Sequence, residues 1–358
     1  MKHASLTFQR TLLRAVIATS IAIFATAAKA TDLPEKLRDT GLFARGAATG
    51  LVQAINANVL SFTPQYPLWC DGAAKRRWLY LPPGTQIDAA DPDAWQFPPG
   101  TKLWKEFSHD AAVETRYIER RADGTWQYAT YVWNEDGTEA VLAPPRGIRA
   151  LPVKGAPNGR YDVPAQADCG ACHEGAAVPV LGIGALQLSP DRDLNAAHGV
   201  RPKPGDVDLR ILVERGLVKN LPPALLIRAP RIAAASPVER ATLGYLHGNC
   251  GHCHNDNGSP APIGLILAQT VMDSEASTNR VLRSSIDASS RFRPQGLQGD
   301  AHIIKPARAD ESVLGIRMRS RLAAVQMPPL GTSSVDSEGL ALIRNWISQL
   351  NHHKEQKS

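Results

Sequence analysis

The sequence is poor in cysteine, with five residues in 358. Four of them form two closely spaced pairs, Cys169 with Cys172 and Cys250 with Cys253, and Cys70 stands alone. An exported protein that relies on disulfides uses an even set of cysteines as its framework. The observed pairing argues against such a framework and indicates that the thiols serve another chemistry.

Short motifs of several common enzyme classes are also absent. The sequence contains no G-x-S-x-G, no H-E-x-x-H and no glycine fingerprint on a strand–helix turn. Charged residues in the first half of the chain, such as Lys75, Glu106 and Glu114, are expected to be solvated or paired. No constellation for nucleophilic catalysis is therefore predicted.

Long hydrophobic runs are confined to the start of the chain. Lys2, Arg10 and Arg14 precede an apolar run that is too short to span a membrane comfortably, and small residues end at Ala30. This pattern predicts a secretory signal peptide at residues 1–30, cleaved near Ala30. The alternative is an uncleaved membrane anchor. No later run approaches the ~20 apolar residues of a spanning helix, so we expect an exported protein with no stable membrane insertion after cleavage.

The chain also lacks a large excess of basic or acidic residues. The formal net charge is +6, but residues 1–30 contain four basic and no acidic side chains. Without them, 36 basic residues stand against 34 acidic ones, a net charge of +2. This balance gives no reason to expect nucleic-acid binding.

The first half of the chain reads as β-structure. Segments such as WLYLP and WQYATYVW are rich in aromatic and β-branched residues, and Asp-Gly turn signals at 123–124 and 136–137 separate such segments. Asp-Gly favours tight hairpins because glycine accepts positive φ at little cost. We predict a small, sandwich-like antiparallel β domain at residues 55–148, with its tryptophans in the core. A helical segment at residues 31–54 is predicted to precede it.

Helical periodicity replaces the strand pattern after about residue 160. Helices are predicted at 206–218, at 236–248 with Ser236 as cap, from Asp310, and at 336–350. Residues 270–309 are expected to be irregular, and 351–358 are expected to form a disordered tail. The predicted fold class is α+β, with an N-terminal β domain followed by a mainly α region.

A histidine follows each cysteine pair directly, which gives two C-x-x-C-H motifs ending in His173 and His254. This is the attachment sequence of c-type haem. Two thiols bond to the two vinyl groups on one edge of the porphyrin, and the histidine supplies the proximal imidazole to the iron. Two motifs in an exported chain with almost no other cysteine predict two covalently bound haem c groups.

Two other uses of these cysteines stay open on the sequence alone. Cys169, Cys172, Cys250 and Cys253 could hold one zinc ion in a tetrahedral site, which would leave both histidines without a role. A redox-active C-x-x-C would need a βαβ context and a single motif, whereas the context here is helix and loop.

An electron-carrying haem normally has a sixth iron ligand, and Met327 is the candidate for the second haem. It lies in AVQMPPLGT, where the prolines keep the loop extended, and a thioether raises the haem potential relative to two imidazoles. Met318 lies on a predicted helix and is expected in the core, while Met272 stays open. No methionine lies between the two motifs, so His198 is the candidate for the first haem. His109 is a further candidate, and an open iron is the alternative.

Several segments, taken in order, resemble a known family. They are YPLW, RWLYLPPGT, FPPGTKLWKEF, VETRYIERR, YATYVWNEDGTEAVL, the first C-x-x-C-H, LGIGALQLS, NCGHCH and QMPPLGT, and they span roughly residues 50–350. In this combination the chain resembles a family of bacterial exported di-haem c-type cytochromes. The resemblance implies a periplasmic protein with an N-terminal β domain and a C-terminal cytochrome c domain. It carries over both motifs and Met327, whereas Cys70 departs from it, because a small residue such as serine is expected there.

These features define a domain plan and competing functions. A first haem-binding region is expected at 149–235 and a C-terminal cytochrome c domain at 236–350. The leading hypothesis is electron transfer through the two haems between redox partner proteins in the periplasm. The alternative is a di-haem peroxidase or oxidase with an open first haem, and a third hypothesis is a β domain that binds a ligand such as a sugar.

Overall fold

A computed structural model describes residues 33–44 and 54–350. The predicted signal peptide, residues 45–53 of the predicted helical segment and the predicted tail at 351–358 lie outside these residues. In the described part of that segment, Leu37–Thr40 form one turn of 3-10 helix. None of the described helices combines the length and the apolar character that crossing a membrane requires.

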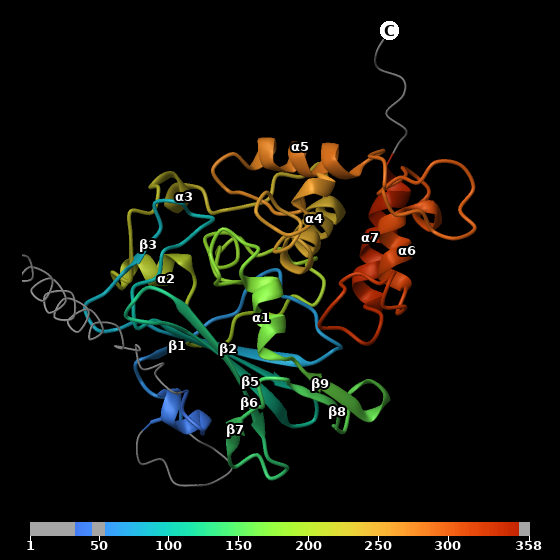
Figure 1. The fold of residues 1–358 in the computed structure, drawn as a ribbon. Helices are drawn as coiled ribbons and strands as arrows, with labels where there is room; N and C mark the ends of the chain where they lie inside the picture. The colour runs from blue at the N-terminus through green and yellow to red at the C-terminus, as the bar shows by residue number, and fades with distance from the viewer. Residues whose placement is uncertain (1–32, 45–53, 351–358) are drawn as a thin grey trace, which may run out of the picture. The chain divides into compact units, whose positions relative to one another are not determined.

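The first half of the chain forms a six-stranded antiparallel sheet with the strand order β1-β2-β4-β5-β6-β7 (Figure 1). Apart from the short β3, each strand pairs with the next along the chain, as tight turns between alternating segments favour. Two-stranded pairs, β8 with β9 and β3 with β10, lie outside this sheet. The strands are β1 (Val59–Ser61), β2 (Ala74–Tyr80), β3 (Ile87–Asp88), β4 (Lys102–Ser108), β5 (Ala112–Arg120), β6 (Trp126–Trp133), β7 (Ala140–Leu142), β8 (Ile148–Pro152), β9 (Arg160–Val163) and β10 (Val218–Lys219).

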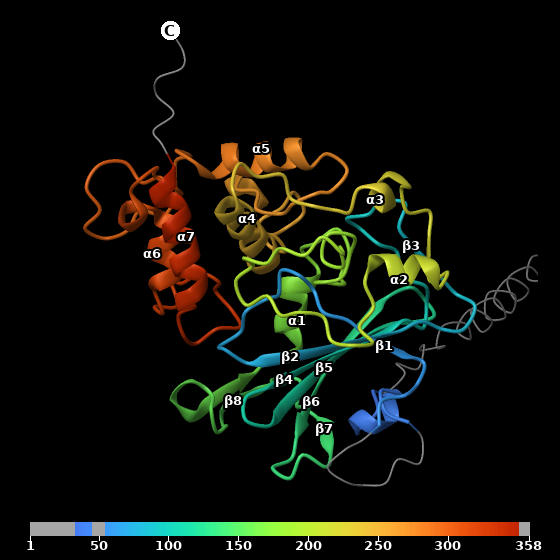
Figure 2. The ribbon, with the colours of Figure 1, turned by 180° about the vertical axis from the view of Figure 1, so that it is seen from behind.

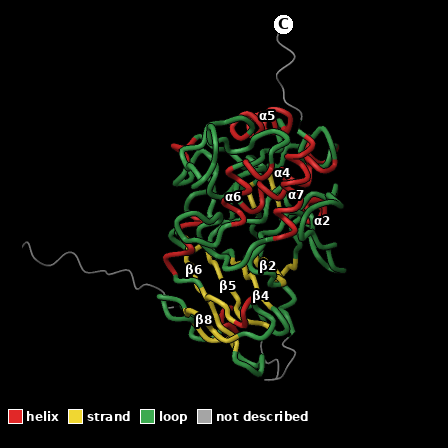
Figure 3. Tube along the Cα trace, turned by 90° about the vertical axis from the view of Figure 1, so that its right-hand side faces the viewer, coloured by secondary structure: helices red, strands yellow, loops and turns green. Residues whose placement is uncertain are grey.

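Helices dominate after residue 164. Two of them begin at the predicted caps: the Ser236 hydroxyl accepts the Glu239 N–H at 3.1 Å, and the Asp336 carboxylate accepts the Gly339 N–H at 2.9 Å. Within residues 35–350, strands gather at one end and helices at the other (Figure 3). The helices are α1 (Gln166–His173), α2 (Leu209–Glu214), α3 (Ala224–Ile227), α4 (Pro237–Asn249), α5 (Ser274–Ser285), α6 (Val313–Arg319) and α7 (Ser337–Gln349).

Three stretches differ from the structure predicted for them. The helix predicted at 206–218 covers only Leu209–Glu214, and Val218 begins the short strand β10. The stretch 270–309, expected to be irregular, contains α5, which begins where Asp273 accepts the Ala276 N–H at 2.9 Å. Its buried side chains are Ser277, Thr278, Val281 and Ser285. Because most of them are polar, few hydrophobic residues mark the buried face of this helix in the sequence. The helix predicted from Asp310 begins later, at Val313, after a 3-10 turn.

The predicted α+β class is confirmed: an antiparallel sheet comes first and a mainly helical region follows. The second layer of the predicted sandwich-like domain is limited to the β8–β9 ribbon, which packs through Tyr161 and Val163 against Val113 of β5. Strands therefore continue past residue 148. Alternation along one strand identifies its buried face, but it does not reveal whether successive strands join one sheet or two.

The two faces of the large sheet meet different partners. On one face, the Trp104 indole N–H donates to the Thr40 hydroxyl at 2.9 Å. Lys105, the next residue, points to the opposite face because side chains alternate along a strand. On this opposite face lies α1, where the His173 ring is 5.2 Å from the Tyr128 ring of β6. Figures 1 and 2 show α1 between the sheet and α4.

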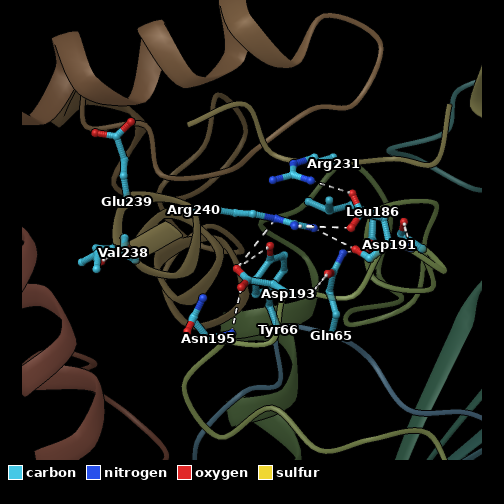
Figure 4. Close-up of polar contacts among 12 residues, drawn as sticks. Gln65, Tyr66, Leu186, Asp191, Asp193, Asn195, Arg231, Val238, Glu239 and Arg240 are labelled. Carbon is cyan, nitrogen blue, oxygen red and sulfur yellow. Dashed lines mark hydrogen bonds and ion pairs between the residues drawn. The ribbon is translucent and has the colours of Figure 1, made fainter. Parts of the chain in front are cut away.

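A buried polar network fixes α4 to two loops (Figure 4). The Arg240 side chain, 8% exposed, donates to the Asp191 carbonyl at 2.7 Å, and its Nε lies 3.8 Å from the Asp193 carboxylate. Asp193 in turn accepts the Tyr66 hydroxyl at 3.2 Å, and burial together with Asp193 raises the pKa of that phenol. Buried charges of this kind persist where each has a partner. The network therefore holds the start of α4 in one position.

Replacing Gly339 by alanine is expected to destabilise the protein by about 1–3 kcal/mol, the usual cost of overpacking a core. An added Cβ would lie 2.4 Å from the Tyr245 ring, where α7 crosses α4. Urea unfolding followed by circular dichroism measures the change. Gly184→Ala is the matched control, because its added Cβ finds its nearest neighbour at 3.7 Å, and its stability should stay within about 0.5 kcal/mol of the wild type. Equal stability of Gly339→Ala and the control would contradict the close approach.

Candidate haem-attachment site

The first C-x-x-C-H motif lies on α1. The Asp168 carboxylate accepts the Ala165 N–H at 2.9 Å and holds the start of this helix. Cys169 and Cys172 are three residues apart in the helix and therefore share one face. Both side chains are half-buried and neither is in a disulfide. The helix thus presents two thiols side by side, followed by His173.

The His173 ring is oriented by one hydrogen bond. Its Nδ1 lies 2.5 Å from the Pro179 carbonyl oxygen. A carbonyl only accepts, so Nδ1 carries the hydrogen and Nε2 keeps its lone pair. Burial lowers the pKa of His173 to about 4, so the ring is neutral at neutral pH. A neutral imidazole with its second nitrogen held in this way is typical of metal-binding histidines.

The second motif forms a tight turn at the end of α4. The N–H groups of Cys253 and His254 both donate to the Cys250 carbonyl, at 3.1 and 2.9 Å. The Asn255 side chain donates to the carbonyls of Gly251 and His252, at 2.9 and 3.0 Å. These bonds satisfy backbone carbonyls of the turn itself and fix the turn that presents the two thiols.

The His254 ring has no partner among the described residues. Its Nδ1 is buried without a hydrogen bond, and no hydrogen bond to its Nε2 is formed within the described part of the chain. Burial, helped by the positive charge of Arg317, lowers the pKa of His254, which favours the neutral ring. A buried imidazole without a partner is costly unless it takes a ligand, and this observation fits an iron-binding role.

The fold brings the two motifs together, although they start 81 residues apart. The thiols of Cys172 and Cys253 lie near enough to shift each other's pKa. The backbone segments that follow the two motifs also lie close together. A Cβ added to Gly175 would lie 3.4 Å from the Gly258 Cα. Both motifs therefore belong to one site, between the sheet and α4.

This donor arrangement fits two haem groups better than one zinc ion. Among the described residues, no three side chains of histidine, cysteine, aspartate or glutamate converge as a metal-ion site would require. The four-thiolate arrangement is thus not formed. Each motif instead offers two thiols and one neutral imidazole without a second protein ligand, which is the donor set of an attached haem.

Met327 lies on a loop that is hydrogen-bonded to α6. Its N–H donates to the Arg317 carbonyl at 3.0 Å, and the Arg317 Nε donates to the Val325 carbonyl at 2.8 Å. The same guanidinium acts electrostatically on His254. Farther along, the Cys70 thiol donates to the Gly331 carbonyl at 2.9 Å. The loop that carries the proposed thioether ligand is therefore anchored at both ends.

His198 has both ring nitrogens at carboxylates. Its Nε2 lies 2.8 and 2.9 Å from the two oxygens of Asp336, and its Nδ1 lies 3.3 Å from Glu338. Both acids are at the start of α7, so the ring links the loop at 198 to that helix. In this arrangement neither nitrogen is free for an iron, and we leave His198 out of the proposed ligand set. His109 keeps a buried Nε2 without a partner among the described residues.

The other residues considered from the sequence are placed as follows. Cys70 is buried, as expected of a structural thiol, and burial raises its pKa. Met318 is in the core, as predicted, whereas Met272 is 59% exposed. Glu114 is fully buried and paired with Arg116. The sequence interpretation missed that Lys105 and Arg116 face the first motif. Finding this would have required the register in which the two strands pair, together with the alternation of side chains along each strand.

Acid is expected to destabilise the protein partly through His247, on the last turn of α4. Its Nδ1 accepts the Gln269 N–H at 3.0 Å, and burial lowers its pKa to about 4. Between the unfolded pKa of ~6.5 and the folded value, the unfolded chain binds the proton and the folded one does not. The free energy of unfolding should therefore fall by up to about 1.4 kcal/mol per pH unit as the pH drops through this window.

Urea unfolding at pH 7 and pH 5 measures this effect. His247→Asn keeps an acceptor near the Nδ1 position but cannot bind the proton, so its stability should fall less between the two values than that of the wild type. An identical fall in both proteins would contradict the assignment to His247.

No protein-family model, curated protein or solved structure matches the chain. The resemblance described from the sequence therefore stays a prediction, and the functional argument rests on the residues of the site.

Proposed function

We propose that the protein is an exported di-haem c-type cytochrome that transfers electrons between redox partner proteins in the periplasm. The observation that carries the proposal is the meeting of the two C-x-x-C-H motifs at Cys172 and Cys253. Electron transfer between two cofactors needs a short path. Because the Cys172 and Cys253 thiols lie near each other, the two haems would be attached at neighbouring positions.

The chain's own residues would do the following work. Cys169 and Cys172 would hold one haem and Cys250 and Cys253 the other, each through thioether bonds. His173 and His254 would bind the irons as neutral imidazoles, and Met327 would supply a thioether to the second. When bound, each haem supplies a one-electron couple whose potential the axial ligands and the surroundings adjust.

A peroxidase or oxidase is the second candidate, and one observation favours it. Because the carboxylates of Asp336 and Glu338 engage His198, that histidine would not be available to bind the iron of the first haem. An iron with an open position can bind peroxide or oxygen. The two candidates differ in the spin state of the first haem.

Haem content and spin state test the proposal on protein matured in a periplasm that supports haem attachment. We expect two haems per chain by pyridine haemochrome and a low-spin spectrum for the second, with Met327 as its sixth ligand. A low-spin first haem without turnover of hydrogen peroxide would favour the electron carrier. One high-spin haem with peroxide turnover would favour the enzyme. Fewer than two haems would contradict both candidates.

A further inference from the structure

The sheet face that α1 covers contains a row of positive charge. Arg77 on β2 lies directly opposite Lys105 on β4, and Lys105 lies directly opposite Arg116 on β5. Residues directly opposite one another in neighbouring strands project to the same face. Like charges in this relation repel and destabilise the sheet, so the row calls for negative charge against it.

The described residues supply little of that negative charge. Arg116 is paired with Glu114 at 2.7 Å, but the same carboxylate oxygen also accepts the Tyr161 hydroxyl at 2.8 Å. Arg77, only 9% exposed, forms no side-chain hydrogen bond or ion pair within the described chain. Lys105 likewise has no carboxylate partner there, and its Nζ lies 5.0 Å from the centre of the Phe107 ring.

More positive charge gathers at the same ring. The Lys75 Nζ lies 5.7 Å and the Arg116 guanidinium 4.2 Å from the centre of Phe107. An aromatic face offsets part of the charge of a cation, but one ring shared by three cations does not neutralise them. Among the described residues, Glu114 is the one carboxylate paired with any of Arg77, Lys105 and Arg116, and burial together with the neighbouring cations lowers the pKa of Lys105.

The row begins beside the first C-x-x-C-H motif. Cys169 interacts electrostatically with Arg116, and His173 interacts with Lys105 and Arg116. From Arg116 on β5 the row runs through Lys105 on β4 to Arg77 on β2. It therefore leads away from β6, the strand on which α1 rests. Two strand spacings separate Arg116 from Arg77, roughly 10 Å. The uncompensated end of the row is therefore the end farther from the thiols.

We propose that Arg77, Lys105 and Arg116 form a carboxylate-binding site, filled by the two propionate groups of the haem attached at Cys169 and Cys172. This inference rests on the proposed function. The propionates of haem lie on the edge opposite the vinyl groups. With the haem held beside Arg116, Lys105 and Arg77 would be the residues that bind these groups, and two carboxylates would give both cations the acceptors that the described chain lacks.

Charge at this position also affects the iron. Cations beside the haem favour the reduced iron, which carries one positive charge less than the oxidised iron. Removing one of them therefore favours the oxidised form and lowers the midpoint potential. The effect should be confined to the first haem, because the row faces its motif.

The test uses the haem-loaded protein and Lys105→Gln. Haem per chain is measured by pyridine haemochrome, both midpoint potentials by spectroelectrochemical titration, and the binding of free succinate by calorimetry. Lys105→Arg keeps the charge, and Lys154→Gln removes one charge from a side chain that is 91% exposed. We expect two haems in every protein, a lower potential of one haem in Lys105→Gln alone, and no succinate binding.

Other outcomes separate the possible occupants. Binding of one succinate by the loaded wild type, weakened at least tenfold in Lys105→Gln, would overturn the propionate assignment in favour of a free dicarboxylate. Unchanged potentials without succinate binding would overturn the site altogether. A wild type without haem would refute the proposed function instead, and succinate binding to that protein would then decide whether the row binds carboxylates. If Lys105→Gln does not fold, Arg77→Gln takes its place at the other end of the row.

Discussion

Replacing Cys250 and Cys253 together by alanine is expected to reduce the haem content from two groups per chain to one. Covalent attachment needs the thiol sulfurs, and Cys70 is the one cysteine of the sequence outside the two C-x-x-C-H motifs. The loss should be complete at that motif and should leave the first haem attached. Pyridine haemochrome, normalised to protein concentration, measures the count, and in-gel haem staining of the denatured chain shows that the remaining group is covalent.

Cys70→Ser is the control for this experiment. The Cys70 thiol is buried and donates to a carbonyl, and serine is the small residue that the family resemblance suggests there. Two haems should therefore remain in this variant. If the double variant also retained two haems, the second motif would not be an attachment site, and the zinc and thiol interpretations would need to be considered again.

Replacing Met327 by alanine is expected to lower the midpoint potential of one haem by about 0.1 V or more. Axial ligands adjust haem potentials over ~0.8 V, and a thioether favours the reduced iron. The anchoring of the loop by Arg317 should keep the rest of the backbone in place. The change should therefore act through the lost sulfur rather than through unfolding. Spectroelectrochemical titration resolves the two potentials, and the oxidised spectrum reports the loss of the sulfur ligand.

Two other methionines provide matched controls for Met327. Met272 is 59% exposed, and Met272→Ala should leave both potentials unchanged. Met318 is buried in the core, so Met318→Leu should affect stability more than potential. A drop in potential with Met272→Ala, or none with Met327→Ala, would remove Met327 from the ligand set.

The cationic row and the two motifs together suggest a division between the haems. The second would take its potential mainly from a thioether ligand, whereas the first would take it from the charge of Lys105 and its neighbours. Two haems with different potentials give electron transfer a direction. One spectroelectrochemical titration of each variant would therefore test both proposals, the Met327 ligand of the second haem and the carboxylate-binding row beside the first.

Local signals in the sequence determined several features on their own. The α+β order follows from alternation in one half and helical periodicity in the other. Ser236 and Asp336 begin helices because a short polar side chain can satisfy the free N–H groups of the first turn. The two C-x-x-C-H motifs are also local, since five consecutive residues provide both thiols and the imidazole.

Only the tertiary structure decided which distant residues meet. Cys172 and Cys253 come together because α1 lies between the sheet and α4. His198 meets Asp336 across 138 residues, which removes it from the candidate ligands. The row that includes Lys105 depends on strand register, and a shift by one residue would turn its side chains to the other face. Periodicity fixes what each segment buries, but the pairing of segments is set by packing over the whole chain.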